Sequence, residues 1–169
     1  MSANDVIVNL RDATGQVIGP PTLNDVIVNL RNATGQSLPY RFRSPVVHHA
    51  TFRDIAPGQE SGFAAGLTAG QLQSTAELDL ELPDPRTGHR CTFTARERAH
   101  LGPEVALECV APDSRPVQVV GARGMGENDI VDAVHGGYRF HVHRWRDGKE
   151  QLDDYRKWYT RFFFTLSNA

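Results

Sequence analysis

The sequence predicts an all-β protein built as an antiparallel β-sandwich. Three observations carry this prediction: short runs in which apolar and polar residues alternate, Pro- and Gly-rich turns between those runs, and three consecutive runs that agree on one apolar face. A chain of 169 residues, 40% of them hydrophobic and 22% charged, can bury one core without disulfides or structural metals. We therefore expect one sandwich domain over residues 23–169, preceded by an N-terminal arm over residues 1–22.

The chain opens with a near-perfect duplication. Asn4–Gln16 and Asn24–Gln36 differ at one position, which is Asp12 in the first copy and Asn32 in the second. Each copy places Val-Ile-Val before a polar Ala-Thr-Gly-Gln sequence, which predicts a strand followed by a turn. The copies can be two ordinary strands of one sheet, a recent duplication whose first copy is a spare strand for a neighbour's sheet edge, or a repeat that binds two equivalent ligands. The Asn-Ala-Thr sequence at Asn32 also fits a glycosylation sequon, which we interpret as a turn because no signal peptide precedes it.

Three alternating runs between residues 76 and 109 define the apolar face. Paired as consecutive hairpins, they put nine apolar side chains on one side, with Phe93 opposite both Leu80 and Leu107. A loop is expected over 96–104. One apolar and one polar face predict a sheet that packs on a second layer. The nine residues are Leu78, Leu80, Leu82, Cys91, Phe93, Ala95, Val105, Leu107 and Cys109.

The same register places Cys91 opposite Cys109. A cross-strand disulfide is then geometrically possible. Nothing in the sequence indicates export to an oxidising compartment, however, so two buried free thiols are favoured.

Other segments complete the predicted sheets. Residues 63–72, rich in Ala and Gly, are expected to form a loop or weak strand, and Gly121–Gly126 a loop. The end of the chain fits both a helical and a strand period. We favour a short turn or helix over Gln151–Arg156 and a closing strand from Trp158 to Leu166. Further strands are expected in the runs 40–43, 46–52, 117–120 and 138–145.

Charge is distributed unevenly along the chain. Residues 1–137 carry 11 basic and 16 acidic side chains, a net charge of −5, whereas residues 138–169 carry 7 basic and 4 acidic ones, a net charge of +3. The total of −2 argues against a protein that binds nucleic acid through its overall charge. No apolar run approaches the length of a membrane span. Because no secretory leader follows Met1, we expect a cytoplasmic protein, with release by a non-classical route left open.

The aromatic and basic C-terminal segment is the strongest candidate for an interaction surface. Trp145 and Tyr159 are interleaved there with Arg144, Arg146 and Arg156. Aromatic rings beside cations are typical of sites that bind lipid headgroups, sugars or protein partners. We therefore expect these five residues to bind a ligand. The alternative is that neighbouring aromatic residues fill the core and leave the charges in water. The residues concerned are Trp158, Phe162, Phe163 and Phe164.

A histidine pair is the candidate metal site. His141 and His143 are two residues apart, so on a strand both imidazoles face one side and can hold a metal ion if a third ligand is near. The pair resembles the HxH element of cupins, but Glu150 stands too far downstream for that motif and the later His is missing. No GxSxG, HExxH or Walker sequence occurs, so we expect no enzymatic activity and, a metal ion aside, no cofactor.

Three sequence elements together resemble the pattern of small aegerolysin-type β-sandwiches. They are the strand that ends in Asn-Ala-Thr-Gly, the Ile-Ala-Pro-Gly turn at Ile55–Gly58, and the Leu-Asp-Leu-Glu-Leu-Pro-Asp-Pro sequence that begins at Leu78. The similarity covers about half of the chain, and the tryptophan-rich middle of that family is absent. The resemblance implies a β-sandwich that binds membrane lipids.

We therefore expect a non-catalytic binding protein whose ligand is a lipid headgroup or a carbohydrate. The first alternative is a self-assembling structural or interaction protein, a homo-oligomer joined by strand addition of the duplicated N-terminal segment. The second alternative is a metal-dependent enzyme that uses His141 and His143.

Overall fold

A computed structural model describes most of the chain after the first repeat copy. Between residues 146 and 159 it describes the backbone alone. The predicted N-terminal arm, residues 1–22, lies outside the described residues. The described part contains no helix that could cross a membrane. The described residues are 25–45, 51–68, 73–83, 88–98, 101–152 and 155–169.

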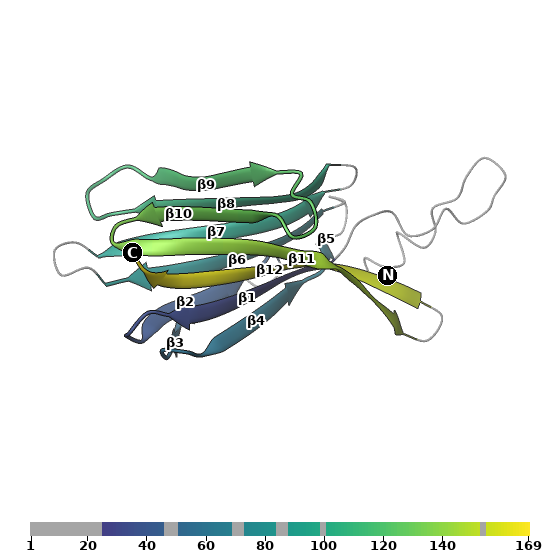
Figure 1. Ribbon diagram of the computed structural model, residues 1–169, viewed down its shortest axis with the longest axis horizontal. Helices are drawn as coiled ribbons and strands as arrows, with labels where there is room; N and C mark the ends of the chain where they lie inside the picture. The colour runs from purple at the N-terminus through teal and green to yellow at the C-terminus, as the bar shows by residue number, and fades with distance from the viewer. Residues whose placement is uncertain (1–24, 46–50, 69–72, 84–87, 99–100, 153–154) are drawn as a thin grey trace.

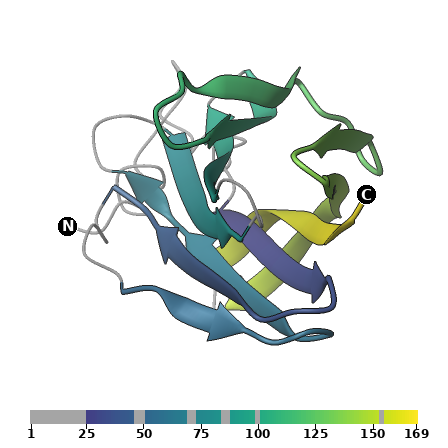
Figure 2. The same cartoon turned by 90° about the vertical axis from the view of Figure 1, so that its left-hand side faces the viewer.

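Two β-sheets pack face to face, and their strands confirm the predicted β-sandwich (Figures 1 and 2). The strands are β1 (Asp25–Ala33), β2 (Leu38–Arg43), β3 (Arg53–Ile55), β4 (Glu60–Ala65), β5 (Leu67–Thr68), β6 (Gln73–Leu82), β7 (His89–Arg98), β8 (Gly102–Val110), β9 (Val117–Arg123), β10 (Ile130–His135), β11 (Tyr138–Leu152) and β12 (Tyr155–Asn168). The five-stranded sheet has the order β10-β11-β12-β1-β4. The seven-stranded sheet has the order β3-β2-β6-β7-β8-β9, with β5 also paired to β6.

The seven-stranded sheet contains the predicted apolar face. All nine predicted side chains are buried. Phe93 lies opposite Leu107 as expected, but its partner on β6 is Leu78, and Leu80 lies opposite Cys91, so the predicted Leu80–Phe93 pair was wrong. A shift of two residues keeps every side chain on its face, so the hydrophobic pattern could not detect it. The predicted loop over 96–104 was also too long, because β7 continues to Arg98 and β8 begins at Gly102.

Cys91 and Cys109 lie opposite each other, as the register predicted, and form a disulfide. The expectation of free thiols was therefore wrong. The two Cα atoms are 4.1 Å apart, the close spacing of a cross-strand pair, and both residues are buried, so the sulfur atoms face each other inside the core. The disulfide links adjacent strands of one sheet and does not join the two layers.

The second repeat copy forms β1, a central strand of the five-stranded sheet. Val26, Val28 and Leu30 of β1 are buried, as the strand prediction required. The strand runs antiparallel to β4 but parallel to β12, whereas we expected antiparallel pairing throughout. Parallel neighbours need a long connection, and here almost the whole domain separates β1 from β12. The segment expected to be a loop or weak strand supplies the end of β4 and β5.

Strands of a C-terminal hairpin cover most of Gln151–Arg156, so the turn or helix predicted over that whole range was too long; residues 153 and 154 lie outside the described residues. β11 runs to Leu152, β12 begins at Tyr155, and these two residues pair with each other. The backbone N–H and C=O groups here form hydrogen bonds between β11 and β12 instead of the hydrogen bonds within a helix. The far end of this hairpin projects beyond the other strands (Figure 1). Gly121–Arg123, expected to be part of a loop, belongs to β9.

The side chain of Asn32, at the end of β1, joins the two sheets. Its Nδ2 donates to the carbonyl oxygen of Gln36 at 2.8 Å and to that of Ile55, on β3, at 2.9 Å. Its Oδ1 accepts from the backbone N–H of Thr34 at 3.0 Å and from the Thr34 hydroxyl at 2.6 Å. The residue is fully buried, so every hydrogen-bonding group of the amide is used inside the protein. This arrangement supports the interpretation of the sequon as a turn.

We predict that Asn32→Asp destabilises the fold by roughly 2–4 kcal/mol, measured by urea denaturation at pH 7. An aspartate at this position has no hydrogen to donate and turns a negative charge toward two carbonyl oxygens. The matched control is Asp12→Asn, the reverse exchange in the first repeat copy, which we expect to change stability by less than about 0.5 kcal/mol. If Asn32→Asp and Asp12→Asn lowered the free energy of unfolding equally, the assignment of the second copy to β1 would be contradicted.

Asp79 organises the outer surface of the seven-stranded sheet. Its Oδ2 lies 2.6 Å from the Nε atoms of both Arg41 and Arg43, and its Oδ1 accepts from the Thr92 hydroxyl at 2.8 Å. Glu77 pairs with Arg43 at 2.9 Å, so two carboxylates balance two guanidinium groups. Burial alone would raise the pKa of Asp79, but the hydrogen bonds from Arg43, Arg41 and Thr92 outweigh it and hold that pKa below its ordinary value.

We predict that Asp79→Asn costs about 1–3 kcal/mol at pH 7 and less in acid. A carboxyl group whose pKa is lower in the folded state stabilises the fold above its unfolded pKa, near pH 4, and loses this contribution as pH falls toward the folded pKa. Urea denaturation of both proteins between pH 7 and pH 2 measures the difference. If the difference in free energy of unfolding between the wild type and Asp79→Asn stayed constant from pH 7 to pH 2, it would contradict the role of the Asp79 charge.

Candidate functional site

The outer face of the five-stranded sheet gathers the histidine pair and Trp145 in one place. His141, His143 and Trp145 alternate along β11, with Phe140 and Val142 of the same strand buried on the inner side. Across the register, His143 lies opposite Phe163 and Trp145 opposite Arg161, both on β12. The sequence therefore predicted correctly that the two histidines share one face of a strand.

Trp145 is the aromatic centre of this face. Its side chain is exposed, at 45%, although it contacts two other rings edge to face. The ring centroids lie 5.8 Å from Phe163 and 5.7 Å from His143, with interplanar angles of 86° and 77°. The Arg161 guanidinium carbon stands 5.9 Å from the Phe163 centroid. The indole is thus supported from the side while part of it remains open to a ligand.

A shallow polar hollow of about 360 Å³ lies beside this aromatic group, between β11 and β4. Two cross-strand rows form it. In the first, His141 faces Thr165, which faces Arg31, which faces Glu60; in the second, His143 and Phe163 lead to Asn29. Gly62 continues the second row without a side chain, and a Cβ atom there would lie 3.1 Å from the Asn29 Nδ2. We refer to this hollow together with Trp145 as the β11 face. The residues that line the hollow are Asn29, Leu30, Arg31, Glu60, His141, His143, Phe163 and Thr165.

Arg144 points away from the β11 face and into the protein. It is 6% exposed, and its Nη1 donates to the Met125 carbonyl oxygen at 2.6 Å. Its backbone N–H donates to the Asp129 carbonyl, and its own carbonyl accepts from the Asn128 N–H. Arg144 thus holds the loop between β9 and β10 against β11. Arg144 follows the buried Val142 by two residues on the same strand, so the sequence alternation already predicted that its side chain faces inward.

The other predicted ligand-binding residues lie on the projecting hairpin. Tyr159 is paired with Asp25 and Gly148 along the backbone, and Arg156 with Gln151. Arg146 stands in the irregular stretch between Trp145 and Gly148. The side chains of Arg146, Arg156 and Tyr159 lie outside the described residues, so their predicted contribution to binding stays a prediction.

The histidine pair lacks a third metal ligand among the described residues. Within that part of the chain, no group of three His, Cys, Asp or Glu side chains is close enough to hold a metal ion. Asp132 lies opposite His141 on β10, but its carboxylate is 3.9 Å from the Arg139 Nε and is engaged there. The imidazoles are therefore available as hydrogen-bonding groups on the β11 face.

Sequence reasoning missed the contributions of β1 and β12 to this face. Phe162 and Phe164 are fully buried, as the core alternative proposed, but Phe163 between them faces outward and supports Trp145. The sequence could have indicated this, because on a strand the middle one of three consecutive phenylalanines faces the opposite side from the other two. Asn29 and Arg31 reach the same face because β1 pairs with β12, a neighbour far away in sequence that no local pattern indicates.

Compared with protein-family models and with curated proteins, the chain matches none. The chemistry of its surfaces is therefore the basis for assigning a function.

We predict that substitutions at Arg144 and Trp145, which are neighbours on β11, affect stability differently, because Arg144 is buried and Trp145 is exposed. Arg144→Met removes the buried hydrogen bond from Nη1 to the Met125 carbonyl at similar side-chain volume and should destabilise the protein by about 1–3 kcal/mol in urea denaturation. Trp145→Ala exposes no core and should cost less than about 1 kcal/mol. An Arg144→Met variant as stable as the wild type would contradict the tethering role of Arg144.

Proposed function

We propose that this protein is a non-catalytic binding protein that holds a carbohydrate, free or as the headgroup of a lipid, on its β11 face. The observation that carries this proposal is the half-open Trp145 indole beside a shallow polar hollow. Sugars offer an apolar C–H face that stacks on an aromatic ring and hydroxyl groups that bind at its edge. A ring and a hydrogen-bonding surface side by side match that combination.

The polar groups of the hollow suit hydroxyl ligands. Asn29 and Glu60 bring an amide and a carboxylate, which together accept and donate hydrogen bonds. His141 and His143 add ring nitrogens from β11, on the far side of β12 from Asn29. The Arg161 guanidinium already binds the Asn29 Oδ1, which fixes the orientation of that amide, so its Nδ2 is available to a ligand. A fixed set of donors and acceptors lowers the entropy cost of binding a polyhydroxylated molecule.

Glycan-array binding and flotation with phosphatidylcholine vesicles, with and without glycolipid, test this proposal. We predict that Trp145→Ala weakens binding about tenfold, equivalent to about 1.4 kcal/mol. The double variant Trp145→Ala, Tyr159→Ala should weaken it at least as much.

The control is Leu101→Ala, which removes an exposed apolar side chain, 64% exposed, from a loop outside the β11 face. This variant should bind like the wild type. Binding that survives the double variant, or no binding to any glycan or glycolipid, would overturn the proposed function.

A further inference from the structure

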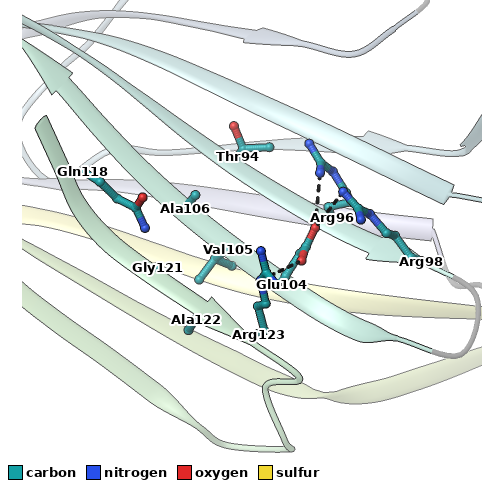
Figure 3. Close-up of a pocket in the computed structure, with 10 residues that line it drawn as sticks. All are labelled: Thr94, Arg96, Arg98, Glu104, Val105, Ala106, Gln118, Gly121, Ala122 and Arg123. Carbon is teal, nitrogen blue, oxygen red and sulfur yellow. Dashed lines mark hydrogen bonds and ion pairs between the residues drawn. The ribbon is translucent and has the colours of Figure 1, made fainter. Parts of the chain in front are cut away.

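A second hollow lies on the outer surface of the other sheet, over β7, β8 and β9, and it is lined by arginine. The Glu104 carboxylate stands among three guanidinium groups (Figure 3). Its Oε1 is 3.2 Å from Arg96 Nη1 and 3.3 Å from Arg98 Nη2, and its Oε2 is 3.9 Å from Arg123 Nε. Among the residues that line this hollow, three positive charges face one negative charge.

The Asp79 cluster on the same surface shows what a balanced arrangement looks like. There two carboxylates meet two arginines, and the shortest contacts are 2.6 Å. At Glu104 the contacts are longer, and the described residues that line the hollow leave two positive charges uncompensated. The next outward carboxylate along β8 is Glu108, beyond Ala106. The excess stands within residues 1–137, whose net charge is −5, so it does not follow from the overall composition.

The arginines of this hollow also keep unused hydrogen-bonding capacity. A guanidinium carries five N–H donors, and one nitrogen of Arg96 and one of Arg98 contact Glu104. The Nε atoms of both are covered by protein, so the Nη groups of these partly exposed side chains are the donors that a ligand can reach. Arg123 is almost fully exposed, with 93% of its side chain in solvent, and can swing toward a ligand. Arginine forks of this kind bind tetrahedral oxyanions in pairs of parallel hydrogen bonds.

Small residues leave room beside the arginines. The hollow encloses about 480 Å³, within the range of small-molecule sites, and Thr94, Ala106 and Gly121 lie between the arginine end and Gln118 (Figure 3). A Cβ atom on Gly121 would collide with the Gln118 Nε2, so glycine at this position lets the amide lie over the hollow. The site thus has a cationic end and a neutral polar end.

We propose that this hollow binds the phosphate or sulfate ester of a small soluble polar molecule such as a sugar. The ester group lies at Arg96, Arg98 and Arg123. A phosphate monoester, which is a dianion above its second pKa of about 6, neutralises both excess positive charges there, and a sulfate monoester, which is a monoanion, neutralises one. The polar body of the ligand extends over the small residues toward Gln118. This site is on the opposite sheet from the β11 face and does not depend on the function proposed there.

Calorimetric titration with glucose 6-phosphate, inorganic phosphate and inorganic sulfate tests the proposal, at an ionic strength held constant with chloride. We expect Arg96→Gln, Arg98→Gln together to weaken glucose 6-phosphate binding at least tenfold, and Arg123→Gln to weaken it several-fold. Glu104→Gln should strengthen binding several-fold, because it removes the carboxylate that competes for the same guanidinium groups. Arg139→Gln, an exposed arginine on the other sheet, is the control and should change nothing.

Gly121→Ala separates the two ends of the site. The added methyl displaces the Gln118 amide, so this variant should weaken glucose 6-phosphate binding and leave inorganic phosphate binding unchanged. Arg123→Gln alters an exposed side chain, so its effect on binding cannot come from unfolding. The proposal is overturned if Glu104→Gln weakens binding, if no probe binds the wild type, or if only vesicles containing phosphatidic acid bind.

Discussion

The buried amide of Asn32 fixes the strand on which the rest of the sandwich depends. It ends β1, contacts its own turn at Gln36 and reaches Ile55 in the other sheet, so it sets both the register of β1 and the approach of the two layers. A shift of β1 by one residue would carry Asn29 and Arg31 into the core and Val28 and Leu30 into water. Because β1 lies between β12 and β4, the same register decides which side chains of three strands share an outer face. The hollow of the β11 face therefore follows from a contact made at the far end of β1.

Polar contacts join the two layers at the rims, and apolar contacts fill the space between them. The Tyr138 hydroxyl donates to the Pro83 carbonyl at 2.7 Å, and the Thr160 hydroxyl donates to the Glu97 carboxylate at 2.7 Å, each across the two sheets. Between these contacts the rings of Phe93 and Phe164 meet at a centroid distance of 4.8 Å. The inner faces are thus occupied by their own packing. The outer faces carry the polar side chains, because alternation along each strand places them there, and both proposed ligand sites lie on these faces.

Local periodicity explains which features could be predicted from the sequence. Alternation at period two identified the nine core residues of β6, β7 and β8 and placed His141 and His143 on one face, because side-chain direction on a strand depends only on position parity. The same parity applied to Arg144 indicates burial, and its charge led us to expect exposure instead. The parallel pairing of β1 with β12 could not be predicted, because strands far apart in sequence leave no local signal of their pairing. The Leu78–Phe93 register could not be predicted, because a shift of two residues leaves every side chain on the same face. The Cys91–Cys109 disulfide was misjudged because the expected compartment outweighed a correct register.

The two arginine clusters on the seven-stranded sheet show why net charge describes this protein poorly. Asp79 is buried beneath Arg41 and Arg43, and each partner needs the other, because removal of either charge would leave the remaining one desolvated. The Glu104 cluster lacks this balance: among the described residues that line its hollow, one carboxylate offsets three guanidinium groups, which repel one another. A bound anion would relieve this repulsion, and the charge imbalance is the physical reason why we propose a ligand site at Glu104 but a structural ion-pair network at Asp79.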